Sequence, residues 1–234
     1  MKCKVIHANI HCTIYLIYIR MFWDNIFGSK LPSVDYCEKA LSGIIARPEY
    51  FISNLSYILV GIYLLIRKDR FGKFLGIISL IVGSFSAIYD ASFRFNAQLL
   101  DLSAMFLLIN FLLLYNLYKL KVTSIRNLYI LGIFLQVIYF IGISLLEGQS
   151  GRILFGLGIF GILFSEYLFW KRKVVLNYKV FISAFLLFII GFLIWLLDSN
   201  KILCSPSIPL NGRTIFHILT AVSIYLLYMY NLKK

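Results

Sequence analysis

Five polar residues that could perform chemistry lie inside, or at the mouths of, long apolar stretches of this 234-residue chain. Placing an ionisable side chain in a hydrocarbon environment costs roughly 2.5–3.5 kcal/mol, so such residues usually mark a site. Two pairs, Ser86 with Asp90 and Arg213 with His217, have a spacing of four residues, which puts each pair on one helical face. Together with Asp101 they predict a polar pocket built from three separate helices.

Two interpretations of this pocket remain open from the spacing alone. In the first, a carboxylate and an imidazole hold a metal ion or activate a water molecule. In the second, Asp90 and Arg213 form an interhelical ion pair, while Ser86 and His217 make hydrogen bonds across the bundle.

The composition places the pocket in a membrane. Hydrophobic residues make up 61% of the chain and charged residues only 14%. Runs of about 18 or more nearly uncharged residues are long enough to cross the bilayer as helices. The fold class is therefore predicted to be all-α, an integral membrane bundle. Seven spans are expected at residues 49–66, 72–93, 98–118, 127–146, 152–170, 178–197 and 212–230.

The basic residues predict the orientation of the bundle. Thirteen of them lie in the loops after the first, third and fifth spans and in the C-terminal tail, against four on the opposite side. Positive residues stay inside, so the N-terminus is expected outside, the C-terminus inside, and the pocket on the external or lumenal side. The net charge of +13 then reflects topology and contact with anionic lipid, with no nucleic-acid partner. Either a bacterial inner membrane or a eukaryotic endomembrane or plasma membrane fits.

Residues 1–48 are expected to form an external segment, and residues 49–234 a single membrane domain. For residues 1–20 two interpretations stay open, a true start at Met21 or an interfacial helix. Asp35, Glu38 and Glu49 could bind a hard cation such as Ca²⁺, or be solvated loop charges. Cys37 and Cys204 are both predicted outside, where they could form a bridge or remain two free thiols.

Three motifs, in the right order, resemble those of the alkaline ceramidase family. They cover both ends of the predicted seven-span core, whereas spans four to six offer only hydropathy. The motifs are Asp35–Glu38 followed by Pro48-Glu49 and Ser53–Leu55, then Ser86 with Gln98–Asp101, and finally Phe216–Ala221.

The resemblance implies a seven-helix membrane hydrolase, related more distantly to the adiponectin-receptor-like proteins. That family cleaves the amide of ceramide with zinc held by three histidines. Ser86 and Asp101 match the serine and aspartate that support the zinc and its water, and His217 matches one histidine. The resemblance also implies a calcium site at Asp35, Glu38 and Glu49, and it favours a disulfide between Cys37 and Cys204.

Two departures from the family pattern are serious. Asp90 and Arg213 stand where the other two zinc histidines should be. Asp can ligate zinc, but a guanidinium has no free lone pair. Either Asp90, His217 and Asp101 hold a metal more weakly, with Arg213 stabilising an oxyanion or a lipid headgroup, or the Asp90–Arg213 pair replaces the metal. The complementary charges favour the second outcome.

The sequence therefore predicts a ceramidase-like hydrolase that uses metal-activated water to cleave the amide or ester of a membrane lipid. In that mechanism Asp90 and His217 hold the ion, Asp101 acts as base or orients the water, and Ser86 donates a hydrogen bond to the oxyanion. The alternative is a non-catalytic lipid-binding or receptor-like relative in which Asp90 and Arg213 replace the zinc.

Overall fold

The structure is a computed structural model, and it describes residues 21–122, 124–145, 150–174, 176–202, 204 and 210–232. The expectations for residues 1–20 lie outside this part of the chain. Within it, every regular element is a helix, so the all-α prediction is confirmed. After a helical stretch at 21–27, the helices are α2 (Pro48–Ser53), α3 (Leu55–Leu65), α4 (Arg70–Ser92), α5 (Phe95–Lys119), α6 (Ile125–Leu145), α7 (Ser150–Lys171), α8 (Tyr178–Ser199) and α9 (Gly212–Asn231).

Six of these helices, α4 to α9, are long and apolar enough to cross a membrane. Their ends lie within a few residues of the predicted spans. The first predicted span, 49–66, is instead two helices, because α2 ends at Ser53 and α3 starts at Leu55. Asn54 lies at this break and directs its side-chain amide to Asp90 rather than to solvent.

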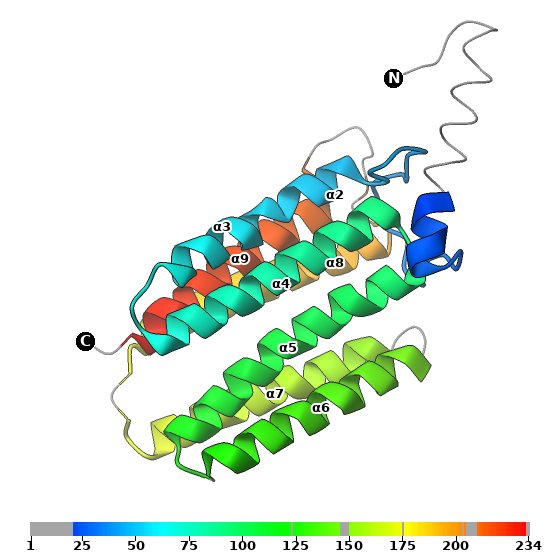
Figure 1. Cartoon of the computed structure of the whole chain (residues 1–234). Helices are drawn as coiled ribbons and strands as arrows, with labels where there is room; N and C mark the ends of the chain where they lie inside the picture. The colour runs from blue at the N-terminus through cyan, green and yellow to red at the C-terminus, as the bar shows by residue number, and fades with distance from the viewer. Residues whose placement is uncertain are drawn as a thin grey trace, which may run out of the picture.

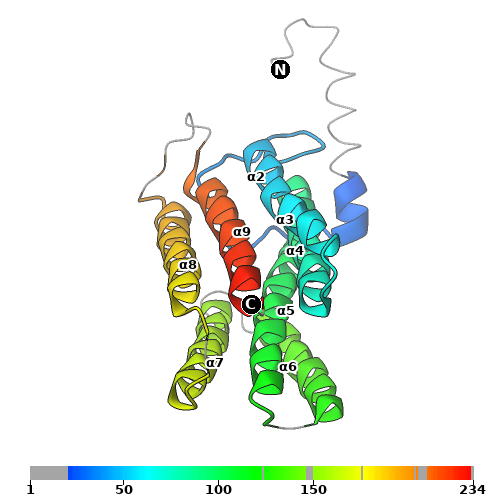
Figure 2. The same cartoon turned by 90° about the vertical axis from the view of Figure 1, so that its left-hand side faces the viewer.

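The long helices run side by side in one bundle (Figures 1 and 2). One group consists of α3, α4 and α9, with α8 packed along α9, and the other consists of α5 with α6 and α7. The contact between α4 and α5 joins the two groups. Small residues permit the tightest approach, since a Cβ on Gly76 of α4 would lie 2.9 Å from the Gly61 carbonyl oxygen of α3.

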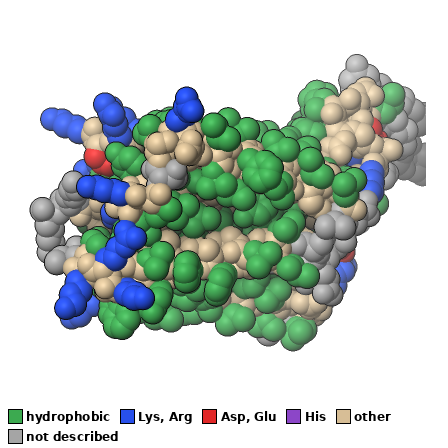
Figure 3. All heavy atoms as spheres, turned by 90° about the horizontal axis from the view of Figure 1, so that it is seen from below, with side chains coloured by type: hydrophobic (Ala, Val, Ile, Leu, Met, Phe, Trp, Pro, Cys, Tyr) green, Lys and Arg blue, Asp and Glu red, His purple; other side chains and the backbone are tan. Residues whose placement is uncertain are grey.

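The two ends of the bundle differ in charge. Figure 3 shows Lys and Arg side chains gathered at one end, while hydrophobic side chains cover the length of the bundle. The C-terminus lies at one end of the bundle and α2 at the other (Figure 1). Several large side chains of α6 and α8 are exposed, among them Ile133 and Leu186, as expected for surfaces that face lipid tails.

Residues 21–47 cover the end of the bundle that carries α2. Trp23 Nε1 donates to the Ile44 carbonyl oxygen at 3.0 Å, and the backbone N–H of Ser33 donates to Gln98 Oε1 at 3.0 Å. Cys37 forms a disulfide with Cys204, and their Cα atoms are 5.3 Å apart. This segment is therefore attached both to α5 and to the connection between α8 and α9.

The start of α9 is packed against the end of α8 without room for a side chain. A Cβ on Gly212 would lie 2.7 Å from the Cβ of Asp198 and 2.8 Å from the Ile194 carbonyl oxygen. Gly156 on α7 has nothing within 4 Å of its Cβ position. The two glycines thus form a matched pair for substitution.

We expect Gly212→Ala to destabilise the protein by about 1–3 kcal/mol, because backbone atoms on both sides must move. Thermal unfolding of the purified protein in detergent measures the effect. Gly156→Ala is the control and should leave the melting temperature unchanged or raise it slightly, because alanine favours a helix interior more than glycine does. Equal melting temperatures for the two variants would contradict the close packing of α8 and α9.

Candidate functional site: a buried guanidinium beside two small cavities

The guanidinium of Arg213, near the start of α9, is the centre of the predicted pocket. Its Nη2 atom lies 3.2 Å from Asp101 Oδ2 on α5, 3.2 Å from Asp90 Oδ1 on α4 and 3.4 Å from Ser86 Oγ. Asp101 and Ser86 accept hydrogen bonds, whereas the contact with Asp90 Oδ1 is an ion pair without hydrogen-bond geometry. One cation therefore joins three helices.

Aromatic rings complete the surroundings of this cation. The carbon of the Arg213 guanidinium lies 4.6 Å from the ring centre of Tyr36 and 5.0 Å from that of Tyr89. A planar guanidinium stacks favourably on such rings, which also exclude water. The segment 21–47 thus supplies one wall of the site through Tyr36.

Asp90 is completely buried and is held from a second side. Its Oδ2 accepts a hydrogen bond of 2.9 Å from Asn54 Nδ2. The backbone N–H of Arg47 donates to the Asp90 carbonyl oxygen at 3.0 Å. These contacts fix the carboxylate at the break between α2 and α3, beside the guanidinium of Arg213.

His217 lies one turn after Arg213 and is also buried. Its Nδ1 atom is 2.7 Å from Ser53 Oγ, at the end of α2. The Nδ1 atom of the ring therefore forms its hydrogen bond with a residue of α2 rather than with Asp90 or Asp101. This position differs from the sequence-based expectation that Asp90 and His217 would hold one ion together.

Asp198, at the end of α8, was not predicted as a site residue although it positions Arg213. It is fully buried, and its Oδ2 accepts the backbone N–H of Arg213 at 2.8 Å. Its Oδ1 accepts the N–H of Cys37 at 2.8 Å, and Tyr50 Oη donates to the same carboxylate. The signal in the sequence was an ionisable residue directly after an apolar span.

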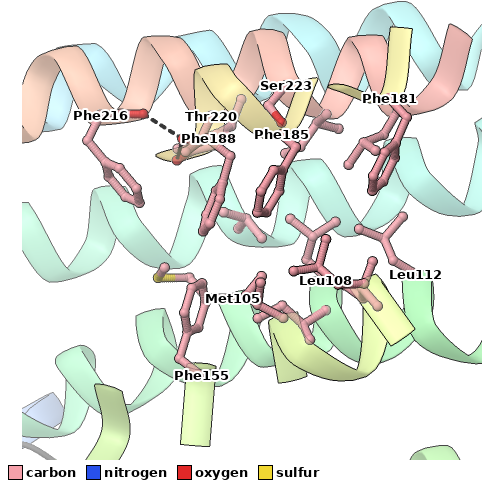
Figure 4. Close-up of a pocket in the computed structure, with 18 residues that line it drawn as sticks. Met105, Leu108, Leu112, Phe155, Phe181, Phe185, Phe188, Phe216, Thr220 and Ser223 are labelled. Carbon is pink, nitrogen blue, oxygen red and sulfur yellow. Dashed lines mark hydrogen bonds between the residues drawn. The ribbon is translucent and has the colours of Figure 1, made fainter. Parts of the chain in front are cut away.

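Two neighbouring cavities extend from the polar site into the bundle. The first, of about 60 Å³, is lined by Arg213, His217, Ser86 and Asp101 together with aromatic residues. The second, of about 100 Å³, is almost entirely apolar and lies between α5 and α7 on one side and α8 and α9 on the other. Figure 4 shows the phenylalanines of α8 and Phe155 of α7 pointing into this space. The two cavities share five lining residues, Tyr57, Val82, Met105, Phe155 and Phe216.

A model of the Ceramidase family matches residues 28–232 of the chain. The chain belongs to the Ceramidase family. This assignment confirms the resemblance found in the three sequence motifs and places the chain in the general class of ceramidase-like hydrolases. A search of curated proteins found no match.

The family implies a zinc ion, but the residues present do not fit one. No group of three His, Cys, Asp or Glu side chains among the described residues is arranged to hold a metal ion. Arg213 lies within 3.2 Å of both carboxylates that could have been ligands, and its guanidinium cannot coordinate a cation. The positive charge in this pocket is therefore provided by the protein itself.

The carboxylates that the resemblance implies as a calcium site also have protein donors as partners. Asp35 binds Arg47 Nη2 at 2.7 Å and Lys201 Nζ at 2.8 Å. The two oxygens of Glu38 accept the backbone N–H groups of Glu49 and Tyr50, both at 2.9 Å. Burial raises the pKa of the Glu38 carboxyl, and these two N–H groups oppose that shift. The cluster does not fit a calcium ion.

Glu49 is part of the same closed network. Its Oε2 accepts a hydrogen bond of 2.7 Å from Asn211 Nδ2, in the connection that leads into α9. The carboxylates therefore join the entry segment to the start of α9, close to Arg213.

We expect Arg213→Ala to destabilise the protein by roughly 3–5 kcal/mol, because two buried carboxylates lose their cation. The double variant Asp90→Asn/Arg213→Ala should recover part of this loss. Thermal unfolding measures both, with Arg126→Ala, at an exposed position on α6, as the control. A melting temperature of Arg213→Ala equal to that of the control would contradict the proposed role of the guanidinium.

We also expect the parent protein to bind no zinc after purification and the double variant Asp90→His/Arg213→His to bind about one ion per chain. The double variant would place histidines at positions 90 and 213, where this chain departs from the family pattern, in addition to His217. Three imidazoles are a common zinc ligand set. Metal content is measured by mass spectrometry, and adding His217→Ala to the double variant should remove the ion. Stoichiometric zinc in the parent would show that the guanidinium does not replace the metal.

Proposed function

We propose that this member of the Ceramidase family binds part of one long-chain membrane lipid, such as ceramide, in the two neighbouring cavities. The lipid chain occupies the apolar cavity, and its amide or ester group reaches Arg213 and His217. The observation that supports this proposal best is that the apolar cavity shares five lining residues with the cavity that contains the buried guanidinium of Arg213. Lipid sites commonly combine an apolar wall with a few fixed polar groups.

The packing of the helices offers such a lipid an entrance from the bilayer. In the described part of the chain, α8 packs along α9, and α7 packs against α5 and α6, but α7 and α8 make no extensive contact. Side chains bridge them, since the ring of Phe155 on α7 lies 6.1 Å from that of Phe188 and 6.2 Å from that of Phe192 on α8. Movement of three rings would open the cavity to lipid.

The proposed topology places the polar site in the outer half of the membrane. In this topology α2 and α3 together form a seventh crossing, the N-terminal segment 1–48 is external, and residues 49–234 are the membrane domain. The bias of basic residues toward the loops at the other end supports this orientation. The ligand then comes from the external or lumenal leaflet.

Hydrolysis of the bound lipid is the second candidate function. Family membership favours it, as does the presence of His217, Ser86 and Asp101 on the wall of the same cavity as Arg213. The cavity of about 60 Å³ holds several water molecules, since each needs roughly 10–15 Å³. In a metal-free reaction His217 would take the proton of an attacking water, and Arg213 would stabilise the oxyanion formed at the carbonyl. The proton would then pass to the leaving amine or alcohol as the bond breaks.

We expect Leu108→Trp to weaken lipid binding by about tenfold or more, which corresponds to ~1.4 kcal/mol. Leu108 lines the apolar cavity (Figure 4), so an indole there occupies the space of the lipid chain. Titration of a fluorescent ceramide into the protein in nanodiscs measures the affinity. Leu186→Trp, at a lipid-facing position on α8 that is 53% exposed, is the control. Equal affinities for the two variants would rule out this cavity as the binding site.

The same nanodiscs distinguish the two candidate functions. Release of fatty acid in the presence of a metal chelator, abolished by His217→Gln with binding retained, would support hydrolysis. Tight binding with no release over a long incubation would support a non-catalytic lipid-binding protein.

A further inference from the structure

The hydrogen bonds of Ser53 determine which nitrogen of His217 carries the proton. Ser53 Oγ lies 2.7 Å from His217 Nδ1 and 2.7 Å from the carbonyl oxygen of Tyr50. Both side chains are buried, with 8% of Ser53 and 2% of His217 exposed. Water therefore does not compete for these contacts.

The single proton of the hydroxyl can serve only one of these two neighbours. The Tyr50 carbonyl oxygen can only accept, so a contact of 2.7 Å requires the hydroxyl to donate to it. The oxygen of Ser53 is then an acceptor for the ring, and Nδ1 must carry a proton. We propose that Ser53 is a positioning residue that fixes His217 in the Nδ1–H tautomer, so that Nε2 presents its lone pair to the cavity.

Neighbouring contacts hold Ser53 in the place this role requires. Ser53 is the last residue of α2, and the next residue, Asn54, donates from Nδ2 to both Tyr50 O and Asp90 Oδ2, at 2.9 Å each. Ser56 Oγ donates to the backbone carbonyl oxygen of His217 at 3.2 Å. The break between α2 and α3 is thus attached to both α4 and α9, and this fixes the hydroxyl against the ring.

The tautomer of His217 affects which ligand groups the cavity can bind. Arg213, Ser86, Asp101 and His217 line it, and Arg213 Nε is buried and has no hydrogen-bond partner among the described residues. The polar end of the cavity then presents the lone pair of His217 Nε2 beside the guanidinium of Arg213, one helical turn away. A ligand with both an N–H and a carbonyl oxygen satisfies both groups. This selectivity rests on the proposed lipid-binding function, whereas the tautomer does not.

Nitrogen NMR of the full chain labelled with ¹⁵N-histidine tests the tautomer directly. The chain has three histidines, and the signals of His217 are identified by their loss in His217→Gln. We expect the parent, without added lipid, to show a protonated Nδ1 and an unprotonated Nε2. Ser53→Ala should shift the ring toward the Nε2–H tautomer, and Ser53→Thr, which keeps the hydroxyl, should restore the parent signals.

Ser56→Ala is the matched control, because Ser56 contacts the backbone of His217 rather than its ring. It should leave the tautomer unchanged. A parent spectrum with a protonated Nε2, or a Ser53→Ala spectrum identical to that of the parent, would overturn the proposal. Melting temperatures of the variants show whether a lost signal reflects unfolding, and the Ser53→Thr spectrum then decides the case.

Binding of a lipid amide and of its N-methyl analogue tests the predicted selectivity for a ligand with an N–H group. The parent should prefer the amide by roughly two- to tenfold, the range of one net hydrogen bond, and Ser53→Ala should lose this preference. Equal binding of both lipids by the parent would overturn the selectivity. If neither lipid binds while the spectra are as expected, the proposed function fails and the assignment of the tautomer stands.

Discussion

The buried guanidinium of Arg213 is the interaction on which the site depends. It balances charge from two helices that would otherwise place carboxylates in a hydrocarbon environment without a partner. Removing one partner of a buried ion pair destabilises a protein strongly, because the other charge is left buried and unpaired. The intact pair, by contrast, stabilises the protein little compared with apolar residues of similar volume. With Asp90 and Asp101 buried at this position, a cation between them offsets the cost of burying two charged carboxylates. In this chain the cation is a side chain of the protein itself.

A third buried carboxylate, that of Asp198, explains how Arg213 is held in place. Asp198 binds the backbone at the start of α9, the backbone of Cys37 in the segment 21–47, and the hydroxyl of Tyr50. The Cys37–Cys204 disulfide attaches the same segment to the connection before α9. The wall that Tyr36 contributes is therefore fixed relative to the guanidinium, as a precise polar site requires.

The six long apolar helices could be predicted because each is determined by its own composition, and their ends followed within a few residues. The break at Asn54 could not, and the hydrogen bond from Asn54 to Asp90 forms only when α2 and α4 meet. The pairing of Asp90 with Arg213 was one of two interpretations consistent with the spacing. The contact between His217 and Ser53 was missed because it joins residues 164 positions apart in the chain.

The sequence by itself determined that this is an all-α membrane protein, where its long helices lie and which family it resembles. Hydropathy and short motifs are local properties that can be read without knowledge of the fold. The resemblance also predicted that Asp90 and Arg213 stand where two zinc histidines would be. Only the tertiary structure decided what the replacements do. The charge on Arg213 is evident from its residue type, but whether it pairs with a carboxylate, stacks on a ring or faces lipid depends on which helices lie beside it. Those neighbours come from residues far apart in the chain, and their arrangement follows from the packing of the whole bundle.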